Sequence, residues 1–76
     1  MNANDIRSLR KGAGMTQKDL ADKLGVTNVT VSRWEKGEYV PSPRYIKQMS
    51  EMFGTNGADI FVASYNTKAN KMKNLY

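Results

Sequence analysis

The chain has 76 residues, which is the size of one small domain. It contains no cysteine and no histidine, so disulfide bonds, cysteine-based zinc sites and catalytic sites that need a histidine base are excluded. Twelve Lys and Arg residues against seven Asp and Glu give a net charge of +5, which favours a polyanionic partner.

The first predicted helix covers residues 4 to about 11. Asn4 is its expected N-cap, Asp5 lies in its first turn, and Ile6 and Leu9 are its apolar residues. Glycines at positions 12 and 14 end it.

The second predicted helix covers residues 16–24 and has signals at both ends. Thr16 is a hydroxyl N-cap, and Asp19 three residues later completes a start that resembles a capping box. Gly25 follows directly and is the residue that most easily adopts the left-handed conformation at a helix C-terminus.

The third and fourth predicted helices follow after short breaks. The third has Thr27 as its N-cap and runs to about residue 36, where Gly37 stops it. The fourth starts at Ser42, with Pro43 at the first helical position. The residues of the fourth helix that we expect to face inward are Tyr45, Ile46, Met49, Met52 and Phe53.

The fifth predicted helix is short and begins at Asn56, with Ile60 and Phe61 facing the core. Residues 66–76 are polar and basic, and we expect a flexible C-terminal tail there after a domain of residues 1–65. Residues 61–76 carry three lysines and no acid, whereas residues 1–60 carry nine basic and seven acidic groups, so the net charge does not locate a binding face. No strand pattern competes, and the predicted fold is a compact all-α domain of four to five helices.

Residues 16–36 have the pattern of a helix-turn-helix unit, since two short helices are joined by only two residues. Ala21 is small enough for two helices to cross closely, and Gly25 permits the sharp turn. The inward positions are all apolar: Leu20, Leu24, Val26, Val31 and Trp34.

The outer side of the third helix carries groups that suit the edges of DNA bases. At about 100° per residue, Val31 and Trp34 define the inner direction, and the other side carries Asn28, Val29, Ser32, Arg33 and Lys36. A guanidinium can donate two hydrogen bonds to guanine, an amide suits adenine, and an apolar group can contact the thymine methyl.

The segment IRSLRKGAGMTQKDLADKLGVTNVTVSRWEKGEYVPS resembles the phage-repressor and Cro family, the lambda-repressor-like or XRE-type regulators. The resemblance covers roughly residues 4–61. It includes the Thr-Gln opening of the second helix, the Trp-Glu-x-Gly ending of the third and the Pro/Ser start of the fourth. It implies a lambda-repressor-like fold.

The resemblance also implies roles for individual residues. Four are expected to read bases in the major groove: Asn28, Val29, Ser32 and Arg33. Three are expected to contact phosphates: Gln17, Lys36 and Arg44. Arg10 and Glu35 resemble the internal pair that holds the recognition helix, together with the structural residues Leu20, Ala21, Gly25, Val31 and Trp34. The chain departs from the family in two places, because Val29 is apolar and the loop of residues 38–40 is less basic.

The expected function is sequence-specific DNA binding in transcription regulation, by a Cro-like dimer that occludes a promoter at a two-fold symmetric operator. An autoregulating antitoxin with a toxin-binding tail and a protein-interaction module without DNA readout remain alternatives. We expect no enzyme activity, no cofactor, metal or small-molecule ligand, and a cytoplasmic location on the nucleoid. The dimer surface is expected within residues 54–65, with Ile60, Phe61 and Val62 as apolar candidates, although a monomer would need these residues for its core.

Overall fold

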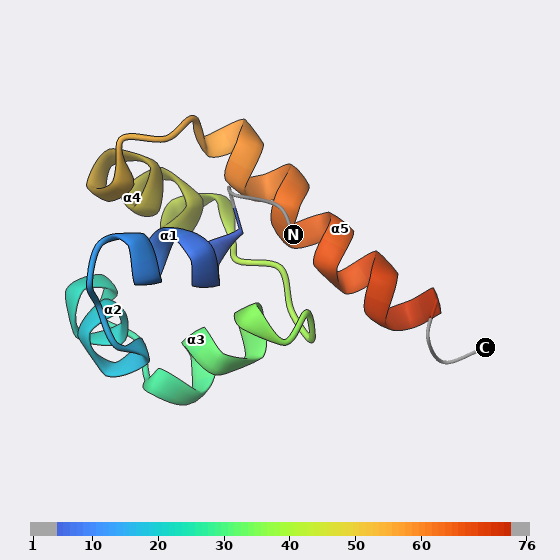
Figure 1. Ribbon diagram of the computed structural model, residues 1–76, viewed down its shortest axis with the longest axis horizontal. Helices are drawn as coiled ribbons and strands as arrows, with labels where there is room; N and C mark the ends of the chain where they lie inside the picture. The colour runs from blue at the N-terminus through green and yellow to red at the C-terminus, as the bar shows by residue number, and fades with distance from the viewer. Residues whose placement is uncertain (1–4, 74–76) are drawn as a thin grey trace.

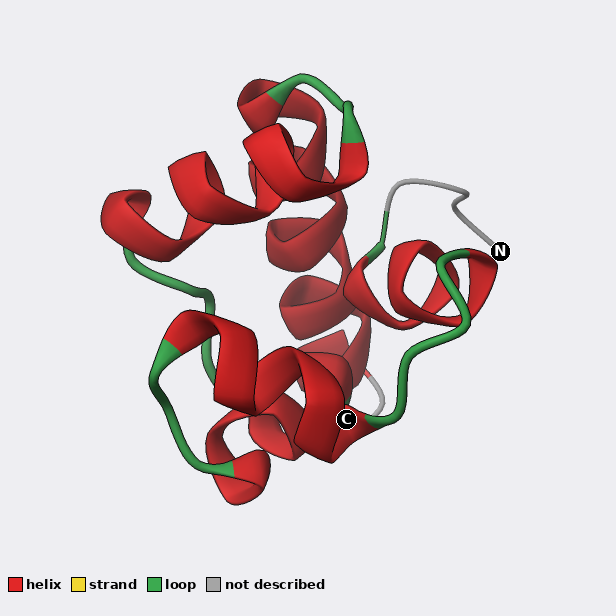
Figure 2. Ribbon diagram, turned by 90° about the vertical axis from the view of Figure 1, so that its left-hand side faces the viewer, coloured by secondary structure: helices red, strands yellow, loops and turns green. Residues whose placement is uncertain are grey.

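The computed structural model describes the backbone of residues 5–73 and the side chains of residues 5–67. Within that range the fold consists of five helices without strands (Figures 1 and 2), as the sequence predicts. They are α1 (Ile6–Gly12), α2 (Gln17–Leu24), α3 (Asn28–Glu35), α4 (Pro43–Phe53) and α5 (Gly57–Lys73). None of the described helices is long and apolar enough to cross a bilayer.

The predicted N-cap of the first helix is wrong by one residue. The helix begins at Ile6, and the carboxylate of Asp5 accepts a hydrogen bond from the backbone N–H of Ser8 at 2.7 Å. Asp5 therefore caps the helix instead of lying in its first turn, and Asn4 lies outside the described residues.

The ends of α2 and the start of α4 match their sequence signals. Thr16 and Asp19 form a complete capping box, and Gly25 ends α2 with φ of +73°. Ser42 precedes α4 and Pro43 occupies its first turn, although the Ser42 side chain makes no capping hydrogen bond.

Helix α5 is longer than the sequence predicts. It continues for two turns beyond Tyr65, through part of the segment expected to be a tail, and ends at Lys73. Its buried face consists of Ile60, Ala63 and Ser64, while Phe61 is 49% exposed. The prediction that Phe61 faces the core is therefore wrong, because it lies about 100° around the helix from Ile60.

The five helices enclose one apolar core. Helix α2 packs against α3, α4 packs against α5, and both α1 and α3 contact α5 (Figure 1). The buried apolar side chains of this core are Ile6, Leu20, Ala21, Leu24, Val31, Trp34, Ile46, Met49, Ile60 and Ala63. Tyr45, Met52 and Phe53 are partly buried against this core. This packing holds α3 by one side only, which leaves its other side open to a partner.

Candidate nucleic-acid interface

The turn between α2 and α3 is built from local hydrogen bonds. The backbone N–H groups of Gly25 and Val26 both donate to the carbonyl of Ala21. These bonds end α2 at the point where the chain reverses direction. Thr27 then caps α3, because its hydroxyl accepts from the backbone N–H of Thr30 at 3.2 Å. These local hydrogen bonds hold α2 and α3 at a fixed angle to each other.

A carboxylate at the end of α3 joins the first three helices. Glu35 accepts two hydrogen bonds from Arg10, from Nε at 2.7 Å and from Nη2 at 3.1 Å. It also accepts one from Gln17 Nε2 at 3.0 Å. Arg10 Nη1 donates to the Met15 carbonyl at 2.8 Å, so the loop before α2 is tied to the same group. The hydrogen bonds to Glu35 stabilise the charged guanidinium and raise the pKa of Arg10.

The outer side of α3 is exposed, as the helical angle predicts. Val31 and Trp34 are buried at 0% and 6% exposure, whereas Val29 is 54% exposed. Asn28 and Arg33 are also exposed, and Ser32 is half-buried. The four residues expected to read bases thus share one side of one helix.

An open depression of about 450 Å³ follows this side of α3. Its lining comprises the base-reading candidates, two phosphate candidates and one acid: Asn28, Val29, Ser32 and Arg33; Gln17 and Lys36; and Glu38. Arg44 is not among them and lies on α4, with its guanidinium carbon 5.5 Å from the centre of the Tyr45 ring. The structure therefore brings six of the seven predicted DNA-contact residues together.

A second depression adjoins the first through the shared residues Gln17, Ser32 and Lys36. Arg7 lines it as an additional exposed cation on α1. The sequence did not single out Arg7, because nothing in its local pattern shows that α1 ends up beside α3.

The side chain of Gln17 lines the depression and also donates a hydrogen bond to a side chain of the protein. One amide hydrogen is donated to Glu35, and the amide carries a second N–H donor. Sequence reasoning missed this bond because its partners lie eighteen residues apart.

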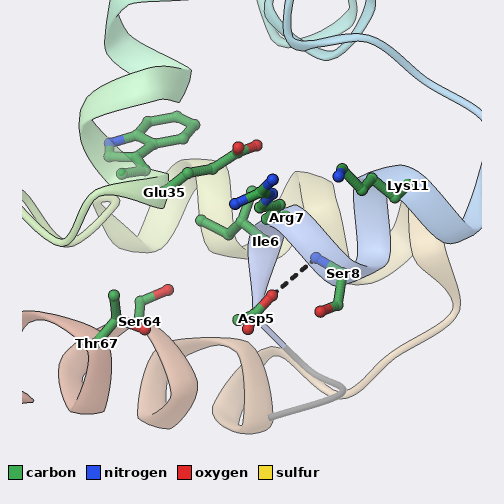
Figure 3. A pocket seen from close by; sticks show the side chains of 9 residues that line it. Asp5, Ile6, Arg7, Ser8, Lys11, Glu35, Ser64 and Thr67 are labelled. Atoms are coloured by element: carbon green, nitrogen blue, oxygen red, sulfur yellow. Dashed lines mark hydrogen bonds between the residues drawn. The ribbon is translucent and has the colours of Figure 1, made fainter. Parts of the chain in front are cut away.

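A separate pocket of about 410 Å³ lies between α1, the end of α3 and α5 (Figure 3). Ser64 lines it with a buried hydroxyl that has no hydrogen-bond partner among the described residues. Trp34 and Glu35 also line it, and it shares no residue with the depression on the outer side of α3. No group of three or more Asp and Glu residues in the described part of the chain could hold a metal ion.

Comparisons with known proteins agree with this geometry. The chain is 39% identical over 59 residues to the HTH-type transcriptional regulator MJ0272 of Methanocaldococcus jannaschii, covering 78% of this chain and 89% of the relative. It is 36% identical over 58 residues to the HTH-type transcriptional regulator YgzD of Bacillus subtilis, covering 76% and 88%. The HTH-type transcriptional activator BcrR of Enterococcus faecalis is 26% identical over 77 aligned positions, which are 93% of this chain and 38% of BcrR.

No solved structure gave a match. The helix-turn-helix family model matches residues 6–60, which contain α1 to α4, the turn between α2 and α3, and the start of α5. The chain therefore belongs to the XRE-type, lambda-repressor-like helix-turn-helix family.

Proposed function

We propose that this protein is a transcription regulator that reads a specific DNA sequence by inserting α3 into the major groove. The observation that carries the proposal is the outer side of α3, where an amide, an apolar group, a hydroxyl and a guanidinium line one open depression. Groups of these kinds distinguish base pairs in the major groove. The family membership and the names of the relatives support the same function.

The proposed interface makes two kinds of contact with DNA, to base edges and to phosphates. Asn28, Val29, Ser32 and Arg33 contact base edges, and the apolar Val29 meets a thymine methyl group. Gln17, Lys36 and Arg44 contact phosphates, which position the protein on the duplex but do not distinguish sequences.

We further propose that two copies bind a two-fold symmetric operator, with half-sites about 34 Å apart. Phe61, Val62 and Tyr65 on α5 are 49%, 52% and 58% exposed, and the rings of Phe61 and Tyr65 lie 6.4 Å apart. These side chains form an apolar patch that a second copy would cover. Ile60, the third candidate from the sequence, is fully buried in the core and is not available for a dimer contact.

The effect on transcription depends on where the operator lies. A dimer over a promoter would block polymerase, as in a Cro-like repressor. The relative BcrR is named an activator, so an operator upstream of a promoter would fit activation instead. Promoter occlusion is our proposal, because the side chains that suit contacts with DNA lie together along the outer side of α3.

Selection of duplexes from a random pool tests the function directly. We expect enrichment of a palindromic motif with half-sites about one helical turn apart. Failure to enrich any motif would contradict DNA reading and favour a protein-interaction module. A single, non-repeated half-site would contradict the symmetric dimer while leaving DNA reading intact.

A further inference from the structure

Arg33 is contacted by two residues that follow α3 in the chain. Its Nε lies 3.8 Å from Glu38 Oε2, and its guanidinium carbon lies 5.7 Å from the centre of the Tyr39 ring. The side chains of Arg33, Glu38 and Tyr39 are all exposed to solvent. A carboxylate and an aromatic face thus meet the one arginine expected to read a base.

The backbone holds Glu38 next to Arg33. The N–H of Glu38 donates to the Arg33 carbonyl at 3.0 Å, and the N–H of Gly37 donates to the Trp34 carbonyl at 3.1 Å. With Gly37 at φ of +77°, these bonds form a Schellman motif at the end of α3. The backbone of Glu38 is therefore held at the end of α3.

This arrangement suits an arginine that presents one edge of its guanidinium to a base. A guanidinium carries five N–H donors, and the ion pair engages the Nε side. The terminal nitrogens can then bond O6 and N7 of guanine. A long side chain loses rotamer freedom when it binds, and two contacts in the free protein reduce that loss. As an exposed ion pair, Arg33 and Glu38 contribute little to the free energy of folding.

Glu38 has a second effect because its side chain is negatively charged. It lines the same depression as Lys36 and the base-reading residues, so it approaches the duplex with them. A carboxylate there repels phosphates whatever the DNA sequence, and only a correct base contact by Arg33 offsets the repulsion.

We propose that Glu38, with Tyr39, is a positioning residue that sharpens the choice of base made by Arg33 and weakens binding to unrelated DNA. This inference rests on the proposed function, since it requires that α3 reads DNA.

The test compares Glu38→Gln with Glu51→Gln, which makes the same charge change at an exposed position on α4. Fluorescence anisotropy measures Kd for the selected operator and for an unrelated duplex of equal length. We expect Glu38→Gln to lower the ratio of specific to unrelated affinity about five-fold, the low end of what one bidentate contact contributes. Glu51→Gln should leave the ratio within about two-fold of the wild-type value. Melting curves verify that each variant folds.

A double-mutant cycle separates positioning from other roles. In an Arg33→Ala background, Glu38→Gln should no longer change the ratio. Tyr39→Phe keeps the ring and should retain discrimination at the Arg33 base pair, whereas Tyr39→Leu should reduce it. A ratio unchanged by Glu38→Gln would overturn the proposal, and so would a loss that persists without Arg33 or maps to another base pair.

DNA reading by α3 and the positioning role of Glu38 are distinguished by different outcomes. If the wild-type protein shows no preference for any sequence, the proposed function fails. If the wild-type protein is specific and the Glu38 and Tyr39 variants discriminate as well as it does, only the positioning role fails.

Discussion

Arg10 is a buried cation, and its position explains how residues far apart in the chain fix the recognition helix. Its side chain is 9% exposed and that of Glu35 is 5% exposed, so the pair is shielded from water. Burial of charge is costly unless the hydrogen bonds are satisfied, and here Glu35 and the Met15 carbonyl use three donors of the guanidinium. The pair ties α1 to the end of α3, the helix that carries the proposed base-reading side chains.

We predict that Glu35→Gln destabilises the protein by about 3 kcal/mol, the low end for breaking a buried ion pair. The cause is an arginine left buried without a counter-charge. Urea unfolding measures the loss. The control is the double variant Arg10→Met with Glu35→Leu, which removes both charges and should cost less than Glu35→Gln alone. If Glu35→Gln unfolds at the wild-type urea concentration, the pair does not stabilise α3.

Arg33 and Lys36 should respond differently to alanine substitution, because we propose that Arg33 reads a base and Lys36 contacts a phosphate. Arg33→Ala should cost about 1–3 kcal/mol and relax discrimination at one base pair. Lys36→Ala should weaken binding to all sequences alike and lower the slope of log K against log salt by about one. Binding titrations over a salt series measure both effects. A uniform loss for Arg33→Ala, or an unchanged slope for Lys36→Ala, would contradict the assigned contact.

Helix α2 shows how one element depends on a few local signals. The Thr16 hydroxyl accepts from the Asp19 N–H at 3.0 Å, and the Asp19 carboxylate accepts from the Thr16 N–H at 2.9 Å. Hydrogen bonds donated to the Asp19 carboxylate, first from the Thr16 N–H and second from the Thr16 side chain, lower the pKa of Asp19 below its ordinary value. These signals lie within four residues, which is why the sequence predicts the start of α2 correctly.

The lowered pKa of Asp19 predicts how stability depends on pH. A carboxyl whose folded-state pKa lies below its unfolded value stabilises the fold fully above the unfolded pKa, and this contribution disappears as pH falls through the folded-state pKa. Asp19→Asn should therefore lose less stability than wild type as pH falls from about 5 to about 2. Urea midpoints at a series of pH values measure this. Thr16→Ala keeps the N–H that is the main cause of the shift, so it should retain most of the dependence. Parallel pH curves for wild type and Asp19→Asn would contradict the prediction.

Local signals also explain which elements and contacts the sequence could predict. The turn at Gly25 and the outward side of α3 follow from glycine conformation and helical angle. The length of α5 does not, because residues 66–73 show no apolar periodicity in the sequence. The contact of Glu38 with Arg33 was missed for a related reason, since it requires the exact path of the chain after α3.

At the scale of the whole molecule, α5 packs against the turn that ends the recognition helix. A Cβ added at Gly37 would lie 2.9 Å from the carbonyl oxygen of Thr67. Gly37 is therefore required for the close approach of α5 as well as for its positive φ. This contact involves a residue beyond the predicted domain boundary at residue 65, so part of the expected tail helps to hold α3.

Gly37→Ala and Gly25→Ala form a matched pair that tests this packing. Gly25 has nearly the same φ, +73° against +77°, but nothing lies within 4 Å of a Cβ added there. Gly25→Ala should therefore cost only the backbone strain, about 1–2 kcal/mol. Gly37→Ala should cost about 1–3 kcal/mol more, because the backbone of α5 must move. Urea unfolding measures the difference, and hydrogen exchange should show faster exchange of α5 amides in Gly37→Ala than in Gly25→Ala. Equal losses with equal exchange in α5 would mean that this helix does not support the end of α3.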